Sequence, residues 1–134
     1  ELHVVHAWEA IGESIMRHGI FMQKTENEVN GYVDQVRRHH TQLLDMLIKE
    51  TSAKVGEDVA DYIKLQLHMP KGSARKVIPE LAKELQVDCI VMGTVARTGV
   101  PGLFMGNTAE TILDQLECSV LAIKPPGFVT PVTL

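Results

Sequence analysis

Two short, uninterrupted runs of apolar residues, 89–92 and 120–123, constrain the fold of this chain more than any other feature. Runs of this length without polar alternation are typical of strands buried on both faces of a parallel sheet. Between them, a helical pattern covers residues 108–116, with Ile112 and Leu116 facing inward. A strand, a helix and a second strand in this order predict a parallel pair joined by a right-handed crossover.

The rest of the chain continues this alternation. Apolar spacing predicts, in chain order, a strand, a loop with room for one helical turn, a long helix and a half-exposed edge strand: residues 2–8, 11–23, 25–53 and 61–69. Another helix starts at the cap Ser73 and contains Pro79, which should remove a hydrogen bond or bend the axis. We therefore expect an α/β fold with one open parallel sheet, in which ligands bind beyond the carboxyl ends of the strands.

The loop after the first apolar run contains the candidate site. Gly93 follows that run directly, and without a side chain it lets the backbone approach a ligand. Gly106 precedes Asn107, which together with Glu110 forms a variant of the capping box. The backbone N–H groups and the dipole at such a helix start attract an anion.

Neighbouring side chains enlarge this set, because Thr108 offers a hydroxyl and Arg97 lies in the loop between the glycines. The candidate phosphate-binding residues are Met92, Gly93, Thr94, Arg97, Gly106, Asn107 and Thr108. A purely structural interpretation stays open at this point. Glycine is common after strands, and Asn-x-x-Glu caps many helices that bind nothing.

Composition narrows the classes of partner. The chain has 134 residues, 45% of them hydrophobic, and a net charge of −4, which predicts one folded domain. No basic stripe is present, so we expect no nucleic-acid partner, and no apolar run has membrane-spanning length. Cys89 and Cys118 look like small core residues of a reducing compartment, so a cytoplasmic protein is expected.

The histidines give no metal-ligand pattern. His3 and His6 are three positions apart in a strand and should face opposite sides, so they cannot share a metal. His18 and His68 are isolated in the sequence. Because no nucleophile motif or spaced carboxylate pair accompanies them, we expect neither a structural metal nor an enzyme.

Three segments, MGTVARTG at 92–99, GNTAE at 106–110 and CSVLAIKP at 118–125, together resemble the C-terminal half of universal stress protein domains. The likeness extends over residues 71–132 and is greatest to the tandem E-type members. It implies the open, Rossmann-like sheet of that family and a regulatory role in the stress response. It also implies pairing of the last strand, through Val120 and Ala122, with a sister domain or a second chain.

The ATP-binding members of that family carry glycine, two residues, glycine, nine residues, glycine, then serine or threonine. Gly93 and Gly106 match the first and third glycines at the proper spacing, whereas Ala96 replaces the second glycine. Asn107 replaces the hydroxyl residue, although Thr108 follows it. The resemblance therefore implies a degenerate site that binds ATP or another adenine nucleotide weakly, or else a phosphate or sulfate ion.

Family domains also begin with a central strand that ends in an aspartate, followed by a helix. Residues 1–134 resemble a single domain without that first strand and helix, with a C-terminal tail at 127–134, so we expect further sequence upstream. Three functions remain open. The first is a nucleotide-binding regulatory domain, the second an interaction module that dimerises without nucleotide, and the third a slow ATP hydrolase.

Overall fold

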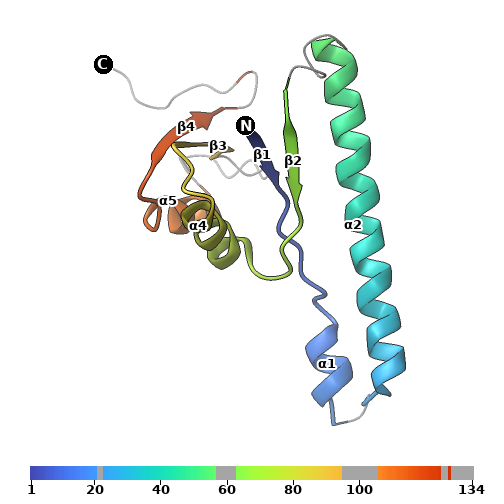
Figure 1. The fold of residues 1–134 in the computed structure, drawn as a ribbon. Helices are drawn as coiled ribbons and strands as arrows, with labels where there is room; N and C mark the ends of the chain where they lie inside the picture. Colours follow the sequence, from blue (N-terminus) through green and yellow to red (C-terminus); the bar gives the residue numbers. More distant parts are fainter. Residues whose placement is uncertain (21–22, 57–62, 95–105, 125–126, 128–134) are drawn as a thin grey trace. The chain divides into compact units, whose positions relative to one another are not determined.

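The structure is a computed structural model that describes residues 1–20, 23–56, 63–94, 106–124 and 127 (Figure 1). The chain forms two compact units, Glu1–Ser73 and Ala74–Leu134. Each unit contains a two-stranded parallel sheet. The predicted α/β class with parallel strands is thus confirmed. The described strands pair as β1–β2 and β3–β4, and in these parts of the chain no ladder joins the two sheets.

The first unit combines two helices with a short sheet. Its elements are β1 (Leu2–Val5), α1 (Glu13–His18), α2 (Glu26–Val55) and β2 (Leu65–His68). Leu2 lies opposite Leu65 and Val5 opposite His68 in the parallel register. Beyond β1 the pairing continues, because the Trp8 N–H donates to Pro70 O at 3.2 Å and the Gly72 N–H donates to Trp8 O at 2.8 Å. Of the predicted strand 2–8, the first part therefore forms β1, and the pairing after it is reduced to an isolated bridge between Trp8 and Lys71.

Helix α2 begins at a capping box and ends at a glycine, both of which can be identified in the sequence. The Thr25 hydroxyl accepts from the Glu28 N–H while the Glu28 carboxylate accepts from the Thr25 N–H, which completes a capping box. Gly56 ends the helix at a φ of 99°, a backbone conformation that side chains disfavour. Val29 and Leu44 are its buried residues. The predicted helix over 25–53 is confirmed.

The loop predicted over 11–23 does contain about one and a half turns of helix, α1, held against α2 by polar contacts. The Gly12 N–H donates to the Tyr32 hydroxyl at 3.2 Å. Arg17 donates to Glu13 at 3.0 Å and to Glu26 at 2.6 Å, and Lys71 forms an ion pair with Glu13 at 2.6 Å. Trp8 is buried beside this network, and its indole N–H donates to Met69 O at 3.1 Å.

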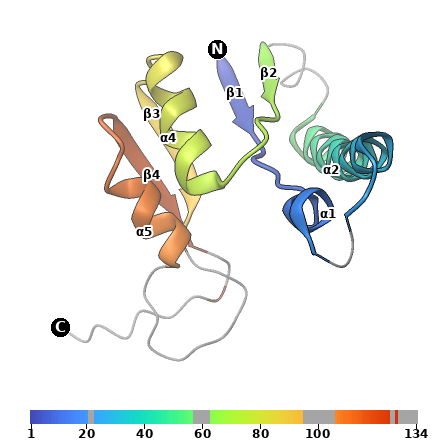
Figure 2. The ribbon, with the colours of Figure 1, turned by 90° about the horizontal axis from the view of Figure 1, so that it is seen from below.

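The second unit has two helices on one face of its sheet (Figure 2). Its elements are α4 (Ala74–Glu84), β3 (Cys89–Gly93), α5 (Asn107–Leu113) and β4 (Ser119–Ile123). Ala109 and Ile112 of α5 are buried. Burial of the strands on both faces, as the continuous apolar runs predicted, is wrong. Val91 and Leu121 are 60% and 54% exposed, because the helices cover only the opposite face of this two-stranded sheet.

Pro79 lies within α4 and is the buried residue of that helix. Proline has no N–H, so the Arg75 carbonyl, four residues earlier, lacks its intrahelical donor. The Gln115 side-chain amide donates to that carbonyl at 3.2 Å and to Thr111 O at 2.8 Å. The backbone group released by the proline is therefore satisfied by a residue that follows α5.

The sequence predicted that His68 is isolated, and this prediction is wrong. His3 Nδ1 lies 2.9 Å from His68 Nε2, because the parallel register brings β1 and the end of β2 together. His6 Nε2 lies 2.8 Å from Nδ1 of His40, on α2. His3 and His6 do have separate partners, in line with their expected opposite orientation. Among the described residues, no group of three or more His, Cys, Asp or Glu side chains is placed to hold a metal ion.

Candidate functional site

The carboxyl ends of β3 and β4 lie side by side, with Gly93 opposite Ile123 in the register. The next residue of each strand therefore reaches the same place. Thr94 is 1% exposed, and the Lys124 ammonium group donates a hydrogen bond to its hydroxyl oxygen. The Gly106 N–H donates to the Thr94 carbonyl at 2.8 Å, which brings the start of α5 to this point.

Of the predicted site residues, Gly93, Thr94, Gly106, Asn107 and Thr108 are thus brought together where β3 ends and α5 begins. Met92 is half-buried in β3 and pairs with Ala122. Arg97 and Ala96 lie outside the described residues, as does most of the tail 127–134.

The start of α5 differs from the prediction by one residue. Gly106, with φ of −76° and ψ of 142°, is the N-cap, and its carbonyl accepts from the Glu110 N–H at 3.0 Å. Asn107 is therefore the first helical residue, and no side chain caps the helix. The Asn-x-x-Glu pattern was wrong as a capping box because the helix starts at the glycine rather than at the asparagine. The exposed Asn107 and Thr108 side chains are left to face the solvent at this end of α5.

Gly93 is not required by the packing of the described residues. A β-carbon built there would meet the Ile123 carbonyl oxygen at 4.0 Å, an ordinary contact distance, and φ at Gly93 is not positive. A left-handed backbone is therefore not what favours glycine at this position. The predicted close approach of a ligand to the backbone is compatible with this geometry.

Lys124 was missed as a site residue by the reasoning from sequence. A usable signal existed, because in a parallel pair the residues that follow two adjacent strands lie next to each other. Lys124 is the first residue after the second apolar run, and Thr94 is the second residue after the first run. The site thus combines a cationic side chain, a buried hydroxyl and the first backbone N–H groups of α5, a set suited to binding an anion.

The outer edge of β4 is the predicted pairing edge. In the described parts of the chain, β4 pairs with β3 alone, and Val120 is half-buried whereas Ala122 is exposed. Leu121 and Ile123 of the same strand are 54% and 51% exposed. None of the described helices is both long and apolar enough to cross a membrane.

Parallel strands alternating with helices, with polar groups gathered beyond the strand ends, define an α/β protein of the open-sheet class. The sequence profile of the Universal stress protein family matches residues 1–124. The chain therefore belongs to the universal stress protein family, and its role lies in the stress response.

Individual relatives agree with this assignment. The chain is similar to Universal stress protein E of Salmonella typhi, with 37% identity over 134 residues, which are 100% of this chain and 38% of that protein. It is 36% identical to Universal stress protein E of Escherichia coli (strain K12) over the same shares of the two chains. The chain thus spans about two fifths of the length of these relatives.

The solved structure of hypothetical protein MJ0577 has a similar fold. Its TM-score is 0.66 at 18% sequence identity, and the match covers 94% of this chain and 76% of MJ0577.

Proposed function

We propose that this chain is a regulatory domain that binds a phosphate group, free or on an adenine nucleotide, at the carboxyl ends of β3 and β4. The observation that carries the proposal is the convergence of Thr94, Lys124 and Gly106 beside the start of α5. The proposed role of the site is to bind an anion, for which its cationic side chain, its hydroxyl and its backbone N–H groups are suited. A cytoplasmic location belongs to the same proposal.

Two substitutions make the site weak for ATP. Ala96 carries a methyl group where the family pattern has glycine, and a left-handed backbone there would cost about 1 kcal/mol. Asn107 lacks the hydroxyl of the pattern, whose hydrogen bond contributes about 0.5–1.5 kcal/mol. Because about 1.4 kcal/mol corresponds to a factor of ten, ATP should bind roughly ten- to a hundredfold more weakly than to a relative with the complete motif.

Calorimetric titration tests the site directly, with ATP, inorganic phosphate and sulfate as separate ligands. We expect Lys124→Gln to weaken phosphate binding by about tenfold, since a charge-assisted hydrogen bond is lost. Lys83→Gln, which removes an equal charge from the last turn of α4, is the matched control and should bind as the unmodified chain does. Equal affinity of both variants for phosphate would contradict the assignment of Lys124.

Restoring the family motif tests the degenerate character of the loop. Ala96→Gly combined with Asn107→Ser should raise the affinity for ATP by about ten- to a hundredfold. If the unmodified protein already binds ATP at micromolar concentration, Ala96 and Asn107 do not weaken the site and the predicted loss of affinity is wrong. Release of phosphate from ATP above background would instead favour the hydrolase.

A second function, pairing through β4, is favoured by the second edge of that strand, which pairs with no other described strand. We propose that Val120 and Ala122 pair antiparallel with a sister domain or with a second copy of the chain, since an apolar edge invites another strand. Ala122→Lys should shift the mass measured by light scattering from dimer to monomer. Gln42→Lys, the same charge change on an exposed position of α2, should leave the mass unchanged. A monomer at high concentration in the unmodified protein would exclude the homodimer.

A further inference from the structure

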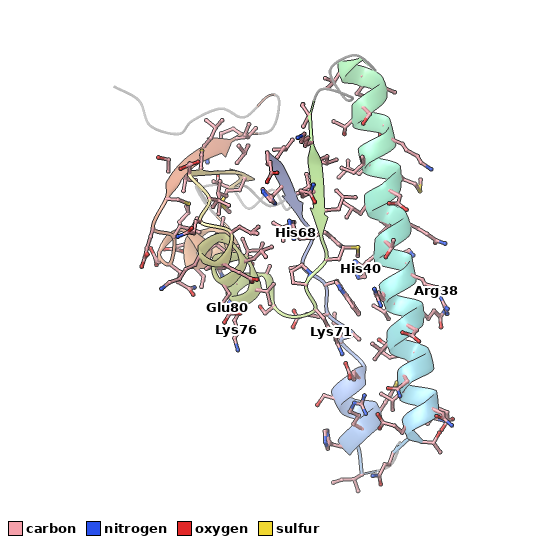
Figure 3. The ribbon with its side chains drawn as sticks, in the orientation of Figure 1. Arg38, His40, His68, Lys71, Lys76 and Glu80 are labelled. Carbon is pink, nitrogen blue, oxygen red and sulfur yellow. The ribbon has the colours of Figure 1, made fainter. Side chains whose placement is uncertain are left out.

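Two pairs of histidines hold β1 in place within the unit Glu1–Ser73. His3 Nδ1 and His68 Nε2 are 2.9 Å apart, and this pair links β1 to the end of β2. His6 Nε2 and His40 Nδ1 are 2.8 Å apart, and this pair links the residue after β1 to α2 (His40 and His68 are labelled in Figure 3). All four rings are half-buried.

The two nitrogens of each pair lie at hydrogen-bond distance, so a single proton can bridge them. The ring centroids are 5.1 Å apart for His3 and His68 and 5.0 Å apart for His6 and His40, as expected when two imidazoles meet nitrogen to nitrogen. In the neutral pair, one ring donates through its facing N–H and the other accepts through its bare nitrogen.

Proton counting shows how such a pair responds to acid. A first added proton binds the outer nitrogen of the donor ring, and the resulting imidazolium still donates to its neutral partner. A second added proton has to occupy the accepting nitrogen, which already faces an N–H. Two donors then point at each other and both rings are charged, so the hydrogen bond breaks and the rings repel.

The surroundings make the two pairs unequal. Glu1 Oε2 lies 3.7 Å from His3 Nε2, the outer nitrogen of that ring, so the charged neighbour of this pair is a carboxylate. The groups around His6 and His40 include the cations Arg37 and Lys71 and the imidazole of His39, and the Glu13 carboxylate forms an ion pair with Lys71. Arg37 precedes His40 by one helical turn, and His39 lies with its ring 6.1 Å from that of His40. Lys71 lies over Trp8, which borders the same pair.

We propose that these histidine pairs are an acid-sensitive clamp that holds β1 on β2 and α2 near neutral pH and releases β1 from α2 when His6 and His40 both become protonated. Burial, and then the charge of His40, lower the pKa of His6 below its ordinary value of 6.5. The unfolded chain therefore takes up this proton at higher pH than the folded chain does. The stabilisation by His6 is complete above that ordinary value and is lost as the pH falls below it.

Nuclear magnetic resonance of the unmodified, ¹⁵N-labelled chain tests the clamp without any substitution. At about pH 7.5 we expect nitrogen–nitrogen couplings across both hydrogen bonds, and at about pH 5 loss of the coupling between His6 and His40 while that between His3 and His68 persists. Absence of the His6–His40 coupling at neutral pH, or its persistence at pH 5, would overturn the proposal.

Variants that keep the polar atom but cannot titrate give a second test. Gln at position 6 places an amide near the former Nε2 and Asn at position 40 places one near the former Nδ1, so His6→Gln with His40→Asn retains a hydrogen bond. In the unmodified chain the equilibrium constant for unfolding should rise several-fold more between about pH 7.5 and pH 5 than in this double variant.

His18→Gln, which removes a histidine that belongs to neither pair, is the control and should keep the full pH dependence. An equal pH dependence in the double variant and the unmodified chain would overturn the proposal. If the double variant does not fold, the couplings in the unmodified chain remain decisive.

Discussion

Thr94 shows how much a single side chain contributes at the junction of β3, β4 and α5. Its hydroxyl is buried and accepts from the Lys124 ammonium group, while its carbonyl accepts from the Gly106 N–H. A change at this one position therefore affects three segments of the chain. The threonine belongs as much to the fold of the second unit as to the proposed anion site.

Thr94→Val keeps the shape of the side chain but removes its acceptor. We expect the free energy of unfolding in urea to fall by about 0.5–1.5 kcal/mol, because the hydrogen bond between the buried Thr94 hydroxyl and the exposed Lys124 ammonium group is lost. Thr51→Val is the control, since the Thr51 hydroxyl is exposed and bonds only to Leu47 O of its own helix. That variant should stay within about 0.5 kcal/mol of the unmodified chain. If Thr94→Val lowers the free energy of unfolding no more than Thr51→Val does, the hydrogen bond between Thr94 and Lys124 contributes little to stability.

Individual residues were where reasoning from sequence was weakest. The local pattern predicts Asn107 as the cap, but the preceding glycine supplies the cap geometry. His68 looked isolated, since its partner is 65 positions away and only strand register joins them. Lys124 and Thr94 meet for the same reason. Such contacts depend on pairing between distant segments, which one-dimensional spacing does not encode.

At the scale of elements, α2 is the helix whose position the sequence predicts most closely. Apolar spacing located it, and the capping box of Thr25 and Glu28 fixes its first residue. The two apolar runs were rightly predicted as strands β3 and β4, whereas their burial was not. Strand formation follows from the runs themselves, but burial depends on how many strands and helices assemble around them.

The cap of α2 gives a stability prediction. Thr25→Ala should lower the free energy of unfolding by about 1 kcal/mol at pH 7, because the Thr25 hydroxyl no longer accepts from the Glu28 N–H or donates to the Glu28 carboxylate. The Thr25 backbone N–H, the Thr25 hydroxyl and then Lys24 lower the pKa of Glu28 below its ordinary value of 4.5. Its contribution is therefore present above that value and is lost as the pH falls below it, so the effect of the variant should shrink near pH 4. An effect in urea unfolding that does not change with pH would contradict this account.

Pro79 and Gln115 predict a coupling between α4 and α5. Gln115→Ala should cost about 0.5–1.5 kcal/mol, since the Arg75 carbonyl loses its outside donor. In a Pro79→Ala background that carbonyl regains an N–H from its own helix, so the same glutamine substitution should cost less. A double-mutant cycle in urea measures the difference. Additive effects would mean that the two residues act independently.

At the scale of the whole molecule, the titratable rings are unevenly distributed. All six histidines of the sequence lie within Glu1–Ser73, whereas the residues of the proposed anion site lie within Ala74–Leu134. Hydrogen exchange followed by mass spectrometry should therefore show acceleration between about pH 7 and pH 5, beyond the intrinsic chemical effect, in peptides of the first unit only. Equal acceleration in β3 and β4 would contradict this separation.

The α/β class and the family were predictable from sequence because short motifs and the alternation of helices and strands can be recognised without knowledge of contacts. How the strands assemble into sheets was less predictable. One open sheet was expected, and the described strands form a two-stranded sheet in each unit. The prediction that a first strand and helix are missing stays a prediction.

The position of the histidines has a practical consequence for anyone studying this protein. Their imidazole signals are natural probes confined to one half of the chain, while the proposed phosphate contacts lie in the other half. A histidine resonance that moves when phosphate is added at constant pH would therefore report an effect of phosphate on the unit Glu1–Ser73. The protein carries its own reporter of such an effect, and no dye or engineered label is required to read it.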